Sequence, residues 1–304
     1  MEYLLLQVLN GVQLGLLMFL LAAGLTLTLG IMDLVNLAHG SLYMMGAYIA
    51  WTLIGVTDSF VLGTLLALPA TFLLGVVVEA VVIRRLYARD HLTQVLATFG
   101  LILFFNELVR AIWGPAGKSI AIPGFLNRTV EILPGVPYPA YRFAIIVVGA
   151  VVAILLAWLV ARTRLGMLIR AGASNRRMIG ALGINIELLF TLVFGLGAVF
   201  AGLAGLMAAP IASVRIGMGD DILILALVII VIGGIGSIKG AFIAAMVVGQ
   251  IDIVGRAFLP GFLKTFMSSS AASSAAPAIS QVLVYVLMAV VLVWRPTGLF
   301  GPRT

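Results

Sequence analysis

Few side chains in this sequence are reactive or ionisable, and one group of polar residues lies within an apolar stretch. Asp33, Asn36 and His39 follow one another at short intervals, with Gly40 directly after the histidine. In a membrane, such side chains are costly unless protein or water surrounds them, so they often mark the pathway of a solute. We therefore interpret these four residues as lining a solute pathway or forming a gate. The alternative is a position at the membrane surface, where Asn36 caps the next helix and His39 touches lipid headgroups.

A second interruption of the apolar pattern is rich in glycine. Gly233, Gly234, Gly236 and Ser237 stand between two hydrophobic stretches, and the hydropathy hardly falls across them. Irregular backbone at membrane depth occurs where protein covers it or where it lines a cavity, as in the broken helices of transporters. We assign these residues to the same pathway or gate. We expect broken helices at two places, near 33–40 and near 233–240.

Three carboxylates within or near apolar stretches, Glu79, Glu107 and Asp252, are candidate proton or cation sites of a secondary transporter. Glu79 stands about one helical turn from Arg84, and Glu107 stands three residues before Arg110. Opposite charges at such spacings lie on the same face of a helix. Local ion pairing is therefore the simpler interpretation, and a proton relay is the alternative.

The sequence contains no arrangement typical of a catalytic or nucleotide-binding site. Gly117, Lys118 and Ser119 end like a phosphate-binding loop, but Ile112 stands where the motif requires its first glycine. The chain has two histidines and no cysteine, which excludes a cysteine nucleophile and thiolate metal sites. We therefore expect that the chain is not an enzyme, holds no metal and binds no cofactor of its own.

The segment 162–184 carries a concentration of positive charge, with five arginines. Residues 175–182 are expected to form a short amphipathic helix that Gly183 closes. A short helix between two membrane spans is suited to docking a partner subunit. The alternative is an ordinary basic loop that binds anionic lipid.

The composition of the chain differs from that of a soluble domain. Of the 304 residues, 63% are hydrophobic and 10% are charged, whereas an average soluble domain is roughly 45–50% apolar and about 25% charged. Apolar stretches of about 20 residues cross the hydrocarbon layer as helices. We predict an all-α polytopic bundle in a single membrane domain, 1–304, with about nine spans and a range of eight to ten. The expected spans are 7–30, 40–57, 60–83, 92–112, 142–161, 187–209, 221–236, 240–257 and 279–294.

Basic residues in the short connections predict the orientation of the chain. They follow the third, fifth and last spans, at 84–89, 162–184 and 295–303, and the nine-span arrangement places all three groups on one side. We expect that side to be cytoplasmic in a bacterial-type inner membrane, with the N-terminus outside and the C-terminus inside. The proline-rich segment 113–141 then becomes an external loop, and the Ser/Ala-rich run 268–276 a flexible or weakly helical external connector. The net charge of +7 thus reflects membrane topology and contact with lipid, not binding of nucleic acid.

Several of these motifs resemble the permease subunits of bacterial ABC transporters for branched-chain amino acids, in particular the first of their two related permeases. The resemblance follows the same order along nearly the whole chain. It rests on QVLNG at 7–11, GLTL at 24–27, VNLAHG at 35–40, Arg170, Ala171, Asn175, Gly183, Ile184, GGIGS at 233–237, Gly240, Ala241 and RPTGLFG at 295–301. The chain departs from the family pattern at Leu37, where an aromatic residue is usual, and in the Ser/Ala-rich run.

The resemblance implies that the chain is one permease subunit of an ATP-driven importer of branched-chain amino acids. Its partners would be a second, homologous permease, two cytoplasmic ATPase subunits and an external solute-binding protein. The segment 162–184 would be the coupling segment, which docks on an ATPase through Arg170, Ala171, Asn175, Arg176, Arg177 and Gly183. Closely similar permeases import urea and short amides, which are therefore alternative solutes. A self-sufficient ion-coupled carrier or channel is an alternative from a different class.

Overall fold

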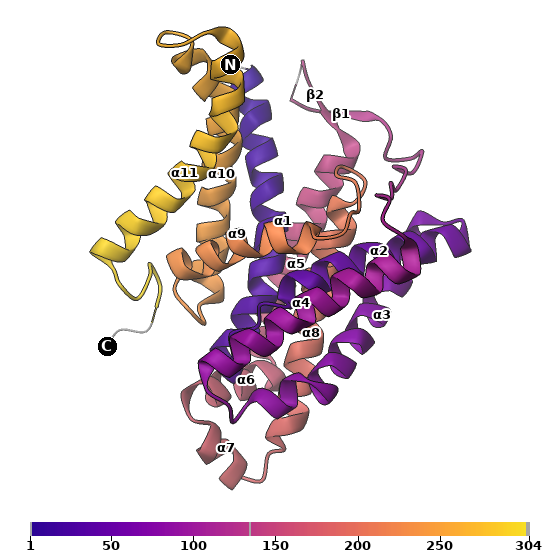
Figure 1. Cartoon of the computed structure of the whole chain (residues 1–304), viewed down its shortest axis with the longest axis vertical. Coiled ribbons are helices and arrows are strands. Elements are labelled where there is room, and N and C mark those ends of the chain that lie inside the picture. The colour runs from indigo at the N-terminus through magenta and orange to yellow at the C-terminus, as the bar shows by residue number, and fades with distance from the viewer. Residues whose placement is uncertain (1, 134, 302–304) are drawn as a thin grey trace. The chain divides into compact units, whose positions relative to one another are not determined.

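The structure of the chain, a computed structural model, is helical apart from one short hairpin (Figure 1). It describes residues 2–133 and 135–301, except for the side chains of residues 133, 176 and 177. The helices are α1 (Glu2–Met32), α2 (His39–Thr57), α3 (Phe60–Val81), the 3₁₀ helix η1 (Ile83–Leu86), α4 (His91–Trp113), α5 (Ala140–Arg162), α6 (Arg164–Ser174), α7 (Arg176–Ala181), α8 (Ile186–Ala208), α9 (Met218–Gly233), α10 (Ile238–Leu263) and α11 (Ser269–Trp294). The strands β1 (Thr129–Leu133) and β2 (Val136–Pro139) lie between α4 and α5. The all-α class is thus confirmed.

Seven of the described helices are long and apolar enough to cross a membrane: α1, α3, α4, α5, α8, α10 and α11. The predicted count of about nine spans is therefore not confirmed. The expected spans 40–57 and 221–236 correspond to α2 and α9, which are not among the seven. Because α9 has 16 residues, it is about 24 Å long, shorter than the roughly 30 Å hydrocarbon layer. The first turns of α2 carry the polar side chains of His39, Ser41 and Tyr43, all of them buried.

The chain divides into two compact units. The first unit contains residues 1–19, 122–151 and 228–304, and the second contains residues 20–121 and 152–227. Three helices, α1, α5 and α9, contribute residues to both units. The single membrane domain stays a prediction.

The core of the second unit is formed by α2, α3 and α8, which pack against one another. Glycines bring the helices close together. A Cβ atom at Gly46 of α2 would overlap the backbone of Gly202 of α8, and a Cβ atom at Gly75 of α3 would overlap Ala198. Small residues allow this approach of backbones in membrane proteins, so the glycines and alanines of α8 serve helix packing.

In the first unit, α10 and α11 pack along each other (Figure 1), and the N-terminal part of α1 packs on α10. The amide Nε2 of Gln250 on α10 donates a hydrogen bond to the carbonyl oxygen of Val8, over 2.9 Å. The hairpin is tied to the same part of α1, because the hydroxyl of Tyr138 donates to Oδ1 of Asn10 over 3.1 Å. The hairpin lies within the expected external loop 113–141, and it pairs its strands in antiparallel register.

The Ser/Ala-rich run, predicted as a flexible or weakly helical connector, forms the first turns of α11. Ser268 caps this helix, because its Oγ accepts a hydrogen bond from the backbone N–H of Ala271 at 3.4 Å. Alanine has the highest helix propensity and serine is a preferred capping residue, so the run is helical although it is less apolar than the span that follows. Of the two predicted alternatives, the helical one is therefore confirmed and the flexible one is wrong.

Candidate functional site

The coupling segment folds into two short helices, α6 and α7, between α5 and α8. Asn175 separates them. Its Oδ1 accepts a hydrogen bond from the backbone N–H of Met178 over 3.0 Å, which caps the N-terminus of α7. An asparagine at this position satisfies one of the free N–H groups of a helix start. The short helix predicted over 175–182 is confirmed.

The end of α7 leads directly into α8. Gly183 has a φ of 82°, a left-handed conformation that glycine adopts without steric cost, and its N–H donates to the carbonyl oxygen of Gly180 over 3.1 Å. Asn185 then caps α8, with its Oδ1 accepting from the N–H of Leu188 over 3.0 Å. The C-terminal end of α7 and the N-terminal end of α8 are therefore each fixed by hydrogen bonds, and only the short connection 182–185 separates the two helices.

The outer face of the coupling segment combines positive charge with exposed apolar side chains. Arg170 of α6 is exposed. Met178 of α7 is 59% exposed, and Leu182, just after α7, is 72% exposed. Arg176 and Arg177 begin α7, and their side chains lie outside the part of the chain that the structure describes. Large apolar side chains left exposed next to cations are typical of a surface that binds a partner.

The inner face of the coupling segment packs on α1 and α8. Ile179 of α7 is buried, with 4% of its surface exposed. A Cβ atom at Gly172 of α6 would contact Ile31 of α1, Leu189 of α8 and Ile179. The adjacent Ala171 is exposed, so the two faces of α6 differ in burial. The coupling segment is thus packed against the second unit on one side and open on the other.

The first predicted break lies between α1 and α2. Asp33 has a φ of 52°, which is uncommon for a residue other than glycine, and the helix stops there. The side chain of Asn36 is buried, and its Oδ1 accepts a hydrogen bond from the N–H of Ala38 over 3.1 Å. This bond closes a turn within the break, and Ala38 is the N-cap of α2, with no side-chain hydrogen bond. The break is confirmed, whereas capping of α2 by Asn36 is wrong.

His39 is fully buried at the start of α2, with 0% of its surface exposed. Its Nε2 lies 3.2 Å from the carbonyl oxygen of Leu21, in the middle of α1, so Nε2 carries the proton and donates it. Contact of His39 with lipid headgroups is therefore wrong. Gly40 packs against the backbone of Gly219 so closely that a Cβ on either residue would overlap the other. The role of these residues in a pathway or gate stays a prediction.

The second predicted break separates α9 from α10 and is also confirmed. Gly234 and Gly236 have φ values of 98° and 80°, where other residues are strained. Ser237 caps α10, because its Oγ accepts from the N–H of Gly240 over 3.1 Å. A Cβ atom at Gly233 would overlap Gly240, so the two helix ends meet closely.

The C-terminal motif 295–301 lies on this second break. The N–H of Leu299 donates to the carbonyl oxygen of Ile232 over 2.9 Å, and the N–H of Phe300 donates to that of Gly233 over 3.0 Å. Two motifs far apart in the sequence are therefore one structural element, a relation that neither motif indicates by itself. An apolar cavity of about 300 Å³ borders it, lined by Val231, Ile235, Leu292, Pro296 and Thr297.

Two of the three candidate carboxylates form ion pairs on their own helices. Oε1 of Glu107 lies 2.8 Å from Nη1 of Arg110, and both side chains are largely exposed. Asp252 on α10 pairs with Arg256 one turn later, with 2.9 Å between Oδ1 and Nη2. The local pairing predicted for Glu107 is confirmed.

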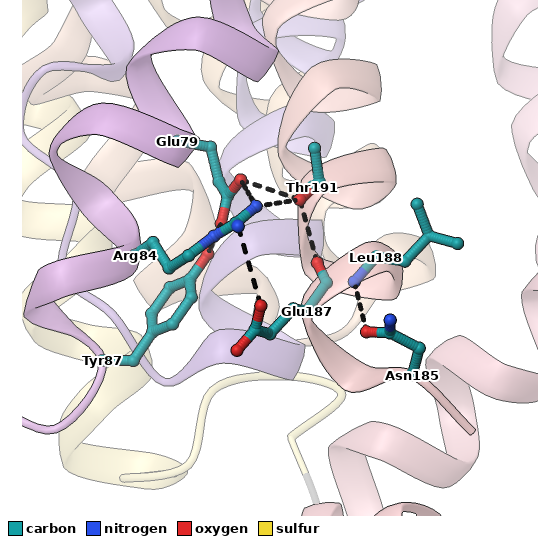
Figure 2. A network of polar contacts seen from close by, with 7 residues as sticks. All are labelled: Glu79, Arg84, Tyr87, Asn185, Glu187, Leu188 and Thr191. Atoms are coloured by element: carbon teal, nitrogen blue, oxygen red, sulfur yellow. Dashed lines mark hydrogen bonds and ion pairs between the residues drawn. The ribbon is translucent and has the colours of Figure 1, made fainter. Parts of the chain in front are cut away.

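The third carboxylate, Glu79, is the centre of a larger network (Figure 2). It stands at the end of α3 with 0% of its surface exposed. Arg84 donates to it from Nη2 over 2.9 Å and from Nε over 3.2 Å, which confirms the predicted pair. The hydroxyls of Tyr87 and Thr191 each lie 2.7 Å from a carboxylate oxygen of Glu79. Nη1 of Arg84 also lies 3.6 Å from Oε2 of Glu187.

The sequence indicates only the Glu79–Arg84 pair of this network. Thr191 and Glu187 belong to α8, more than a hundred residues away, and nothing in their local pattern points to a buried carboxylate. Burial and the hydrogen bond donated to Glu79 raise the pKa of the Tyr87 phenol. Tyr87 therefore keeps its proton at physiological pH and acts as a donor.

Comparison with known proteins places the chain among transport proteins. The model of the family described as branched-chain amino acid transport system / permease component matches residues 7–292. The permease protein BraD of the high-affinity branched-chain amino acid transport system of Pseudomonas aeruginosa is 30% identical, with 97% of this chain and 95% of that protein aligned. The permease protein LivH of the corresponding Escherichia coli (strain K12) system is 27% identical, over 98% and 96% of the two chains.

A further relative extends the comparison. The probable branched-chain amino acid transport permease protein LivH of Methanocaldococcus jannaschii is 27% identical over 81% of each chain. No solved structure matches the chain significantly.

Proposed function

Since the chain belongs to the family of permease components of branched-chain amino acid transport systems, we propose that it is the membrane subunit through which an ATP-driven importer moves branched-chain amino acids. The observation that carries this proposal is that permeases named for this solute align with the chain over nearly its full length. These relatives are transport subunits, and the chain is not an enzyme. Urea and short amides are the less favoured solutes, because the relatives compared above are named for branched-chain amino acids.

The chain works within an ABC transporter assembly. Its specific partners are a second, homologous permease, two cytoplasmic ATPase subunits and an external solute-binding protein. The ATPase subunits bind and hydrolyse the nucleotide, and this chain binds no cofactor of its own. The exposed Met178 and Leu182, together with the arginines of the coupling segment, support docking of an ATPase there.

Two of the three basic groups lie at the same end of the second unit, which supports a common cytoplasmic side. Arg84 of the first group contacts Glu187 in the first turn of α8, directly after the coupling segment. Positive residues gather on the cytoplasmic side of bacterial membrane proteins. In the nine-span arrangement, with α2 and α9 counted as spans, the N-terminus is then outside and the C-terminus inside the inner membrane.

The two helix breaks serve as hinges of the gate. Asp33, Asn36, His39 and Gly40 form the first hinge, and the buried polar contacts of Asn36 and His39 hold it in one conformation. Gly233, Gly234, Gly236 and Ser237 form the second hinge, where positive φ angles and close glycine contacts support a bend. Hinges commonly consist of a few residues at element ends.

The docking role is tested by the substitution Met178→Asp, which places a negative charge in the exposed apolar centre of the coupling segment. We expect loss of solute uptake by the reconstituted importer and loss of copurified ATPase. Phe125→Asp is the matched control, because Phe125 is also exposed, at 56%, but lies in the expected external loop. Unchanged uptake and unchanged copurification for Met178→Asp contradict the docking role.

A self-sufficient carrier is tested with the purified chain alone in liposomes. We expect no concentrative uptake without the ATPase subunits. Transport by the chain alone, abolished by Glu107→Gln, supports the carrier and overturns the importer.

A further inference from the structure

The buried carboxylate of Glu79 is held by groups from two distant parts of the second unit (Figure 2). Arg84 on η1 and Tyr87, just after η1, approach it from the chain that follows α3. Thr191 approaches it from α8. A fully buried charge is stable only while it is paired and hydrogen-bonded, so these groups have to stay together as long as the end of α3 packs on α8.

The hydroxyl proton of Thr191 has two alternative acceptors. Its hydroxyl oxygen accepts a hydrogen bond from Nη2 of Arg84 over 2.9 Å. Its single proton has two acceptors, Oε2 of Glu79 at 2.7 Å and the carbonyl oxygen of Glu187 at 2.9 Å. The hydrogen bond to Glu79 links α8 to α3, whereas the hydrogen bond to Glu187 lies within α8.

The rest of the interface between α3 and α8 has a different character. Gly195 of α8 packs against the ring of Phe72, and Gly75 of α3 packs against Ala198. Such contacts are not directional, so they permit a small sliding or rotation of one helix on the other. Hydrogen bonds are directional and weaken steeply when they are misaligned. The network is therefore a point at which a movement of α8 is resisted or passed on.

We infer that Glu79, Arg84, Tyr87 and Thr191 form a switchable joint that passes a displacement of the coupling segment from α8 to α3. This inference rests on the proposed docking of an ATPase on the coupling segment. Asn185 begins α8 directly after that segment, and Thr191 follows about two turns later. A displaced α7 moves this first part of α8, and the hydroxyl proton of Thr191 passes between the two acceptors. All four are positioning residues, because they act on helix position and touch no solute.

The joint is tested by a matched pair of substitutions at one position. Thr191→Val keeps the shape of the side chain and removes the hydroxyl, whereas Thr191→Ser keeps the hydroxyl. Both variants are reconstituted in the complete importer, with ATPase subunits and binding protein, and leucine uptake and ATP hydrolysis are measured on the same vesicles. We expect Thr191→Val to lower the amount of leucine moved per ATP about tenfold, as for loss of one hydrogen bond to a charged group. We expect Thr191→Ser to stay near the wild-type ratio.

A second substitution tests the same joint from the other side. Tyr87→Phe removes a hydroxyl that donates to Glu79 and retains the edge-to-face contact of the ring with Phe190, at 5.1 Å between centroids. We expect Tyr87→Phe, like Thr191→Val, to lower the amount of leucine moved per ATP. Glu107→Gln is the control for a changed polar contact outside the joint, because the pair of Glu107 with Arg110 is exposed.

The outcomes separate a joint from a merely structural network. Thr191→Val with normal ATPase copurification and a low transport ratio supports the joint. An unchanged ratio in both Thr191→Val and Tyr87→Phe overturns it, and so does a ratio as low in Thr191→Ser or Glu107→Gln as in Thr191→Val. Loss of uptake in strict proportion to the amount of assembled complex also overturns it. If Met178→Asp retains both uptake and ATPase, the docking proposal has failed, whereas an intact docking site with an unchanged ratio means that only the joint has failed.

Discussion

Glu79 and Glu107 present nearly the same pattern in the sequence and two different environments in the structure. Each is a glutamate on an apolar helix with an arginine about one turn later. Glu79 is completely buried and accepts hydrogen bonds from three residues, one of which comes from α8. The side chain of Glu107 is 65% exposed and pairs with Arg110 alone among the hydrogen bonds described.

The difference shows that the contribution of an ion pair to stability depends on the residues that cover it. No described residue covers the pair of Glu107, and exposed pairs contribute little to stability. Around Glu79, α8 removes the water and supplies a hydroxyl in its place, so breaking the network leaves buried groups unsatisfied. We therefore expect substitutions at Glu79 to lower the free energy of unfolding several fold more than substitutions at Glu107.

Glu79→Ala is expected to have the largest effect. It removes the common acceptor and leaves the hydroxyls of Tyr87 and Thr191 without it. We expect the free energy of unfolding to fall by about 3 kcal/mol, as when one partner of a buried ion pair is removed. Thermal unfolding of the purified chain in detergent measures this loss, with Glu107→Ala as the matched control. Equal losses for the two variants would remove the distinction between the sites.

Tyr87→Phe is expected to have an intermediate effect on stability. Loss of one hydrogen bond to a charged group should lower the free energy of unfolding by about 1.5 kcal/mol. In the double variant Tyr87→Phe/Thr191→Val, the loss in the free energy of unfolding should differ from the sum of the two single losses, because groups in one network are not independent. Strict additivity in the unfolding measurement would argue against a shared network.

The pH dependence of stability gives a smaller signal from the same residue. Burial, and then the hydrogen bond donated to Glu79, raise the pKa of Tyr87 in the folded chain above its unfolded value. Its contribution is therefore fully present below about pH 10, the ordinary pKa of tyrosine, and is lost as the pH rises above that value. We expect wild-type stability to decline relative to Tyr87→Phe above about pH 10. Parallel unfolding curves from neutral to alkaline pH would show that the phenol is not held in this way.

Glu107→Gln is expected to have the smallest effect. An exposed pair one turn apart contributes about 0.5 kcal/mol or less, and added salt screens it. The unfolding temperature should be nearly unchanged, and the remaining difference should vanish in concentrated salt. A loss as large as that of Tyr87→Phe would contradict the difference between the exposed and the buried site.

Several local features followed from the sequence because they depend on residues close together in the chain. Hydropathy located the helices, and the glycines and polar residues located both helix breaks. Asn175 and Gly183 marked the ends of the short helix α7 by the chemistry of capping. The same kind of local rule left two alternatives for Ser268 to Ala276, flexible or weakly helical, and the structure shows a capped, alanine-rich helix.

The sequence by itself determined the membrane class, the position of the breaks, the basic coupling segment and the resemblance to a permease family. Those features are set by composition, by period and by short motifs, which tertiary contacts do not alter. Only the packing of distant parts of the chain decided three other features. They are the burial of His39 against Leu21, the hydrogen bond between Leu299 and Ile232, and the contact of Thr191 with Glu79. The physical reason is that the free energy of a polar group depends on the water that its neighbours exclude, and those neighbours are far away along the chain.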